Sequence, residues 1–173
     1  MGAQLAGFSD SPDKKKEDHK GENARIRFCC SEMQGWRGNM EDSHIAELDI
    51  GDGNSLFAVF DGHGHTGAEC ATLTRDYISR EFEGWETEYS TQRGSLCEKV
   101  HFSSSMSNAY RQMSSLLESG EVGVDASHSG TTASTLIITD RYLHTAHVGD
   151  SRCLLIEQEK VKALTIDHDT DRE

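Results

Sequence analysis

The order of the periodic segments constrains the fold of this chain more than any other feature. Apolar residues recur at helical spacing over Thr66–Glu83 and again over Ser95–Ser119. No strand-like run separates these two segments, whereas strand-like runs lie on both sides of the pair. Alternating βαβ units need a strand between successive helices. The order therefore predicts an α+β fold in which helices pack on the faces of antiparallel sheets.

The predicted strands fall into two groups. Those before the helices are Ala24–Met33, Ser43–Ile50 and Asn54–Phe60. Those after the helices are Thr131–Thr139, Tyr142–Val148, Cys153–Glu157 and Val161–Thr165. The Gly-Asp-Gly-Asn cluster at 51–54 is a hairpin turn signal. The strands on either side of it are therefore expected to pair antiparallel.

A chain of 173 residues has room for one domain with a substantial core and is short for two. Residues 1–23 contain Ser, Asp, Lys, Gly and the only proline, Pro12, without an apolar period. We therefore predict a flexible amino-terminal arm over 1–23 and a folded domain over 24–173.

The formal net charge of the chain is −13. Nucleic-acid affinity depends mainly on Lys and Arg contacts to phosphates, so the excess of acids argues against a nucleic-acid partner. The five cysteines contain no CxxC pair, and a disulfide framework is not expected. The sequence has no run of about 20 apolar residues and no apolar secretory signal at its start. These features predict a cytoplasmic or nuclear protein.

The opening Met1-Gly2 offers one route to a membrane. Gly2 could accept a myristoyl chain after Met1 is removed, although Ala6 stands where the acceptor motif prefers Ser or Thr. One acyl chain binds membranes weakly, and the lysine run 14–16 could add electrostatic attraction. We expect weak membrane association if Gly2 is myristoylated. The alternative is a solvated tail.

The first candidate site combines Arg37 with the acidic pair Glu41 and Asp42. The arginine fork suits two phosphate oxygens at once. Carboxylates are the hard oxygen ligands that Mg²⁺ and Mn²⁺ prefer. A set of surface salt bridges is the alternative interpretation of this segment.

The second candidate site follows the apolar run Asn54–Phe60, which ends abruptly in Asp61-Gly62-His63. A rigid strand can aim side chains at its end. Asp61 could bridge two cations, the carbonyl of Gly62 could be a further oxygen ligand, and His63 could donate a proton. The alternative is an Asp-Gly turn after a strand.

Two further segments carry a weaker signal. Small residues enter a strand over Ser129–Thr135, which indicates close packing against another element or a tight approach to a ligand. Val148–Arg152 places Asp150 at the turn between two strands, and a simple hairpin is the alternative there.

The ordered series of segments is more specific than any one of them. The series MQGWR..MED, DGHG, SGTTA, GDSR and LTIDHD runs from about Arg25 to Asp169 and resembles the protein phosphatase 2C family of metal-dependent phosphatases. The resemblance implies a four-layer αββα fold: an antiparallel β-sandwich flanked by helices, with a two-metal site at one edge. Residues 24–173 would then be a partial phosphatase 2C-like catalytic domain with its carboxy-terminal part missing.

The resemblance also implies a role for each matching residue. The metal ligands would be Glu41, Asp42, Asp61, the carbonyl of Gly62 and, at an additional position, Asp150. Asp61 would bridge the ions, and Glu41 and Asp42 would hold them directly or through water. Arg37 would bind the substrate phosphate, and His63 would act as general acid toward the departing oxygen. The catalytic set is then His63, Arg37 and Asp61.

The implied activity is hydrolysis of phosphoserine and phosphothreonine in proteins, with two or more Mg²⁺ or Mn²⁺ ions as cofactor. Two such cations can activate water and compensate phosphoryl charge. Family members continue for about as many residues again and supply later aspartates to the metal site. An inactive phosphatase-like module that binds phosphoproteins or another partner without turnover is therefore the alternative. A calcium-binding protein is disfavoured, since no DxDxDG spacing occurs.

Overall fold

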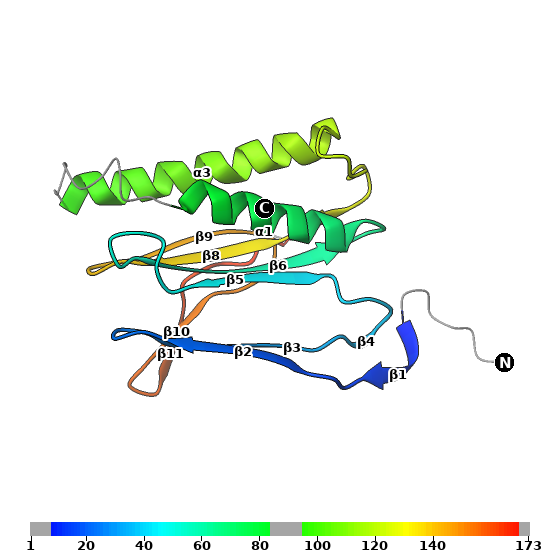
Figure 1. The fold of residues 1–173 in the computed structure, drawn as a ribbon, viewed down its shortest axis with the longest axis horizontal. Helices are drawn as coiled ribbons and strands as arrows, with labels where there is room; N and C mark the ends of the chain where they lie inside the picture. Colours follow the sequence, from blue (N-terminus) through cyan, green and yellow to red (C-terminus); the bar gives the residue numbers. More distant parts are fainter. Residues whose placement is uncertain (1–7, 84–94, 170–173) are drawn as a thin grey trace.

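The computed structural model describes residues 8–83 and 95–169. Its elements in chain order are β1 (Phe8–Asp13), β2 (Glu17–Glu22), β3 (Arg27–Glu32), β4 (Gly35–Arg37), β5 (Asp42–Glu47), β6 (Ser55–His63), α1 (Gly67–Phe82), α3 (Ser95–Ser119), β7 (Gly130–Thr131), β8 (Ala133–Ile138), β9 (Leu143–Val148), β10 (Leu154–Glu157) and β11 (Lys160–Ala163). In Figure 1, α1 and α3 lie on one face of the main sheet, and the β2–β3 pair lies beyond its other face. The α+β class predicted from the sequence is confirmed.

The main sheet has the strand order β5-β6-β8-β9, and every pairing in it is antiparallel. The predicted hairpin joins β5 to β6: the N–H of Asn54 donates to the carbonyl of Gly51 at 2.9 Å, and Gly53 has a φ of 71°. A positive φ of this kind is costly for residues with a Cβ, which explains the glycine. Strand β6 is the centre of the sheet and carries fully buried Leu56 and Phe60.

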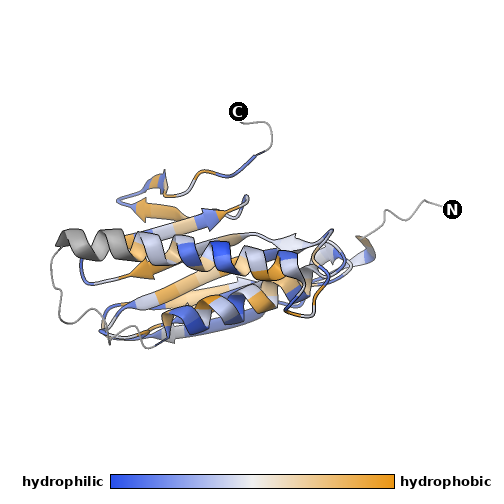
Figure 2. Cartoon of the chain, turned by 90° about the horizontal axis from the view of Figure 1, so that it is seen from above, coloured by the Kyte–Doolittle hydropathy of each residue, from blue (hydrophilic) through white to orange (hydrophobic). Residues whose placement is uncertain are grey.

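The two described helices cover one face of the main sheet. The buried face of α1 follows the helical period through Cys70, Thr74, Ile78 and Phe82. On α3 the buried positions among its described side chains are Phe102, Met106, Ala109 and Met113. Each fully buried Ile or Phe contributes about 1.5–3 kcal/mol relative to exposure. Figure 2 shows alternating polar and apolar colour along both helices and apolar colour on the strands beneath them. Neither helix in the described part of the chain combines the length and the apolar character that a membrane span requires.

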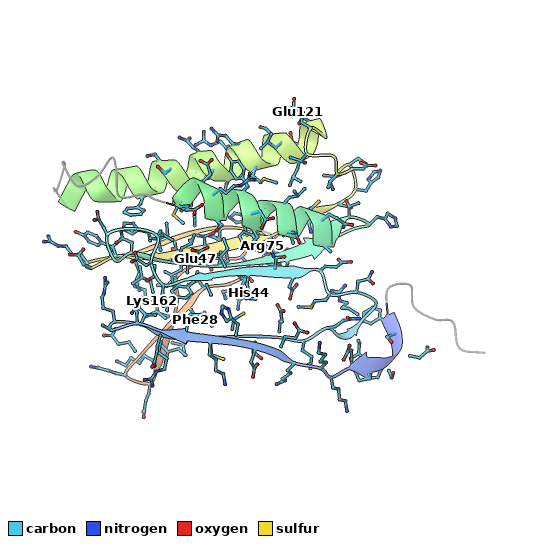
Figure 3. All side chains as sticks on the ribbon, in the orientation of Figure 1. Phe28, His44, Glu47, Arg75, Glu121 and Lys162 are labelled. Atoms are coloured by element: carbon cyan, nitrogen blue, oxygen red, sulfur yellow. The ribbon has the colours of Figure 1, made fainter. Side chains whose placement is uncertain are left out.

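Aromatic and polar side chains join the β2–β3 pair to the main sheet. The rings of Phe28 on β3 and Phe57 on β6 lie 5.5 Å apart between centroids. Nδ1 of His44 on β5 lies 3.4 Å from a carboxylate oxygen of Glu32 on β3. Figure 3 shows Phe28 and His44 in the space between these two layers. The β-sandwich expected from the family resemblance is thus built, in the described residues, from one helix-covered sheet and a smaller opposing layer.

The structure differs from the sequence analysis over the expected flexible arm, since β1 and β2 both lie within residues 8–22. Strand β2 pairs with β3 from Glu17↔Glu32 to Glu22↔Arg27. These strands are held by backbone hydrogen bonds and bury little apolar surface, so they leave no apolar period in the sequence. Residues 1–7, with Gly2, lie outside the described residues. The domain boundary at 24 stays a prediction.

Candidate active site

The candidate site segments, which are far apart in the sequence, lie at one edge of the main sheet. Because neighbouring strands run in opposite directions, the end of β6 meets the start of β5, the start of β8 and the end of β9 at this edge. The register pairs Asp42 with Asp61 and Ala133 with Val148. Beyond β8, the short strand β7 continues the pairing, with Gly62 opposite Thr131.

Asp42 and Asp61 form the centre of the site. They lie opposite each other on β5 and β6, and their carboxyl groups are close enough to interact electrostatically. Burial raises the pKa of Asp42, and the charge and hydrogen bond of Asp61 raise it further, whereas the charge of Arg37 lowers it. A second carboxylate this close disfavours the ionised form of Asp42. A cation between them would relieve that repulsion.

Gly62 and Glu41, the chain neighbours of Asp61 and Asp42, are joined by a backbone hydrogen bond. The N–H of Gly62 donates to the backbone carbonyl of Glu41 at 3.1 Å. A Cβ at position 62 would lie 2.2 Å from the carbonyl oxygen of Gly67, so only glycine fits there. A Cβ at position 67 would lie 2.9 Å from Oε2 of Glu41. The Glu41 carboxylate therefore lies against the first residue of α1, where the helix dipole favours negative charge.

His63 is the last residue of β6, and it is exposed. It pairs with Gly130 on β7. A Cβ at position 130 would lie 3.0 Å from Nε2 of His63, so the imidazole rests on this glycine. Gly64 follows with a φ of 89°, which turns the chain toward α1. An exposed imidazole at this edge can exchange a proton with a bound group.

Arg37 ends β4, and its charge acts on Asp42. Asp42 thus lies opposite Asp61 and within electrostatic range of Arg37. The Cζ of Arg37 lies 5.8 Å from the ring centroid of Phe8, its partner on β1. The side-chain amide of Gln34 donates to the carbonyls of Arg37 and Gly38 at 2.9 and 3.1 Å. Phe8 and Gln34 therefore both contact the turn that carries the Arg37 guanidinium.

Asp150 lies in the turn after β9, at the same edge, and is exposed. The hydrogen bonds of this turn are made by its neighbours. The carbonyl of Gly149 accepts from the N–H of His168 at 2.9 Å, and Ser151 lies against Thr132. Arg152 binds both carboxylate oxygens of Asp167. The GDSR and LTIDHD segments thus pack together, but the described contacts do not join Asp150 itself to the Asp42–Asp61 pair.

The donors at this edge suit a hard divalent cation, since they are carboxylate and carbonyl oxygens. Asp42, Asp61 and the carbonyl of Gly62 could hold one side of such an ion, with Glu41 beside them. Within residues 8–83 and 95–169, no group of three or more His, Cys, Asp or Glu side chains lies close enough together to hold a metal ion.

Sequence reasoning missed two contributors to the site. Phe8 lies in the segment expected to be a flexible arm, and no sequence signal marked it as the partner of Arg37. Thr132 belongs to a run that was expected to pack closely or to approach a ligand, and its Oγ1 accepts from the N–H of Asp61 at 3.0 Å. The small-residue run around Thr132 was the available signal, because it indicated a tight approach.

Comparisons with known proteins identify the family of this chain. The sequence model of the family Protein phosphatase 2C matches residues 26–173. Probable protein phosphatase 2C 4 from Paramecium tetraurelia is 32% identical over 177 residues, which covers 96% of this chain and 55% of that protein. Probable protein phosphatase 2C 21 from Arabidopsis thaliana is 32% identical, and 98% of this chain aligns with 57% of it. The chain spans about half the length of these curated relatives.

Solved structures show the same fold. The serine/threonine phosphatase Stp1 from Staphylococcus aureus matches with a TM-score of 0.61 at 16% identity, over 97% of this chain and 58% of that one. The catalytic domain of the serine/threonine protein phosphatase PstP, solved in complex with two manganese ions, matches with a TM-score of 0.55 at 21% identity, over 88% of this chain and 54% of that one. Since the family match extends over nearly all of the folded chain, this chain belongs to the protein phosphatase 2C family.

Proposed function

We propose that this chain carries the phosphate-binding and metal-binding part of an enzyme that hydrolyses phosphoserine and phosphothreonine in proteins with Mg²⁺ or Mn²⁺. The observation that carries the proposal is the facing pair of Asp42 and Asp61 with the charge of Arg37 beside it. Family membership supports the reaction class, and the manganese ions of PstP support the choice of metal.

In this proposal the residues divide the chemistry among them. Asp61 and Asp42 would hold the cations, and the Gly62 carbonyl would be a further ligand, with the N–H of Gly62 fixed by the backbone carbonyl of Glu41. When bound, two divalent cations supply water activation and charge compensation. The planar fork of Arg37 binds two phosphate oxygens and orients the phosphoryl group. His63 donates a proton to the departing serine or threonine oxygen.

A second candidate is a binding module that engages phosphoproteins without turnover. It is favoured by one observation: in the described part of the chain, no three ligand side chains gather around one point. Mg²⁺ needs several ligands in near-octahedral positions, and an incomplete set binds it weakly. In this candidate Arg37 keeps its phosphate contact while hydrolysis is lost.

The deciding experiment measures Mn²⁺-dependent hydrolysis of a phosphothreonine peptide by the chain and by Asp61→Asn. The enzyme proposal expects turnover that falls at least about 100-fold in the variant, because a ligand of the cations is removed. Asp140→Asn is the matched control, since Asp140 is exposed at the opposite end of the β8–β9 hairpin. Turnover that is equal in Asp61→Asn and wild type would refute the assignment.

If the chain shows no turnover, binding of the same peptide decides between the candidates. Arg37→Ala is expected to abolish binding in the module proposal, and Arg37→Lys is expected to recover only part of it, because an ammonium lacks the bidentate fork. Peptide affinity that is unchanged in both variants would contradict the module proposal as well.

We also propose a cytoplasmic or nuclear location, with weak membrane association if Gly2 is myristoylated. Gly2 lies outside the described residues, so support comes from the sequence alone. Mass spectrometry of the amino-terminal peptide from the native source would test the modification, and Gly2→Ala is expected to prevent it.

A further inference from the structure

Thr132 holds both backbone polar groups of Asp61. The N–H of Thr132 donates to the carbonyl of Asp61 at 2.9 Å, and Oγ1 of Thr132 accepts from the N–H of Asp61 at 3.0 Å. Because the N–H and the carbonyl are both fixed, the direction in which the Asp61 side chain leaves the backbone is fixed as well.

The sheet is altered at this position to make that contact. The pairs Val59↔Ser134 and Gly62↔Thr131 place Thr132 opposite Asp61. In a regular antiparallel ladder the Asp61 N–H would donate to the Thr132 carbonyl. Instead it donates to the Thr132 hydroxyl, and the Thr132 carbonyl accepts from the hydroxyl of Thr131 at 2.8 Å. A side chain has therefore replaced a backbone acceptor at the residue that begins the candidate site.

The same side chain contacts the turn that carries Asp150. Oγ1 of Thr132 lies 2.5 Å from Oγ of Ser151. A Cβ at Gly149, whose φ is 92°, would lie 2.7 Å from Cγ2 of Thr132. The turn thus closes on Thr132 with Gly149 against its methyl group and Ser151 against its hydroxyl. Asp150 lies between Gly149 and Ser151 in the chain, and both of these neighbours contact Thr132.

We propose that Thr132 and Ser151 form a positioning pair that sets the Asp61 carboxylate and the Asp150 turn relative to each other. The proposal rests on the proposed function, since it assigns the pair a role in holding the divalent cation. Groups that orient metal ligands commonly change metal affinity 10–100-fold when they are removed. Small displacements matter here, because a ligand must be held within about 0.5 Å of its productive position.

The test uses Thr132→Val, which keeps the methyl group against Gly149 and removes the hydroxyl. Isothermal titration with Mn²⁺ alone is expected to show at least about a tenfold rise in Kd. Thr132→Ser restores the hydroxyl and is expected to bind within about threefold of wild type. Thr145→Val is the matched control, because Thr145 is a half-buried threonine on β9 that lies opposite Leu136, away from this edge. Its Kd for Mn²⁺ is expected to be unchanged.

A second measurement separates positioning from loss of fold. Amide hydrogen exchange at Asp61 is expected to quicken in Thr132→Val, while exchange at buried Phe60 stays slow. In the double variant Thr132→Val/Ser151→Ala, the effects on Kd are expected to fall short of their sum, since both remove one shared hydroxyl contact. If Thr132→Val does not fold, Ser151→Ala decides, and an unchanged Kd in that variant overturns the proposal.

The outcomes distinguish this inference from the proposed function. If Asp61→Asn weakens Mn²⁺ binding while Thr132→Val does not, the positioning pair is wrong and the proposed function stands. If the wild-type chain shows no saturable Mn²⁺ binding, both are overturned together. A tenfold loss in Thr132→Val with recovery in Thr132→Ser supports the pair.

Discussion

At the scale of single residues, the candidate site depends on close backbone approach. Three glycines leave space that a side chain would otherwise fill. Gly62 makes room for the carbonyl of Gly67, and Gly67 makes room for the carboxylate of Glu41. Gly130 makes room for the ring of His63. Residues without a side chain therefore occupy the positions where β6, α1 and β7 meet. Packing of this kind tolerates little change, because the interior transmits strain.

Gly62→Ala tests this dependence. Its Cβ would lie 2.2 Å from the Gly67 carbonyl oxygen and 2.7 Å from that of Glu41, and both are backbone atoms that cannot rotate away. We expect the free energy of unfolding to fall by about 3 kcal/mol or more in urea titration. Gly120→Ala is the control, since Gly120 has a φ of 69° and no atom within 4 Å of the added Cβ. That variant should cost only about 1 kcal/mol of backbone strain.

At the scale of elements, α3 is tied to the sheet by a buried hydroxyl. The Tyr110 hydroxyl donates to the carbonyl of Ala146 on β9 at 3.1 Å and lies 2.7 Å from the hydroxyl of Thr135 on β8. Burial raises the pKa of Tyr110 to about 12, against the opposing effect of the Thr135 hydrogen bond. The phenol is thus both a packing group and a protonated donor.

Tyr110→Phe is expected to lower the free energy of unfolding by about 1–2 kcal/mol at neutral pH, because the two partners lose their hydrogen bond. The unfolded chain loses the tyrosine proton near pH 10. Between pH 10 and 12 the folded protein therefore binds more protons than the unfolded chain, and its stability falls as pH rises. The wild type should lose its advantage over Tyr110→Phe across this window in urea titrations. An advantage that is independent of pH would contradict the assignment.

The short strand β1 connects the amino-terminal region to the site. Phe8 lies under the guanidinium of Arg37, and a cation–π contact at an exposed site is worth about 0.5–1 kcal/mol. Phe8→Ala should therefore weaken phosphothreonine-peptide binding about two- to fivefold, as measured by fluorescence polarisation. Phe8→Tyr retains a ring and is expected to bind like wild type. Equal weakening by both variants would show that the ring face is not what matters.

At the scale of the whole molecule, apolar surface collects on one hairpin. Ile156, Val161 and Leu154 on β10 and β11 are 71%, 64% and 50% exposed. Figure 2 shows this apolar colour on the hairpin near the carboxy-terminal end. Clustered apolar side chains outside the core favour association. We expect the chain to self-associate at high concentration.

Ile156→Thr tests this expectation, since threonine keeps the β-branched shape while it reduces apolar area. Sedimentation velocity at several concentrations should show less self-association than in wild type. Lys160→Thr on the same hairpin leaves the apolar side chains in place and is the control. Equal association of Ile156→Thr and wild type would exclude this hairpin as the cause.

The sequence predicted elements whose stabilisation is local and missed those that depend on distant partners. The run that became β6 is continuously apolar from Leu56 to Phe60, and a strand leading to Asp61 was predicted there. Strand β1 was not predicted, because its pairing with β4 depends on backbone hydrogen bonds and not on its own apolar residues. The role of Thr132 was hidden for a related reason, since residues 61, 132 and 151 meet only in the folded sheet.

Asp61 directly follows Phe60, a fully buried core residue of the central strand. The Asp61 carboxylate is therefore attached to a backbone segment that core packing holds in place. A core substitution that shifts this strand by a fraction of an ångström should first appear as poorer cation retention, before any loss of folding. In the reverse direction, added Mn²⁺ should raise the melting temperature, because a ligand that binds only the folded state stabilises it.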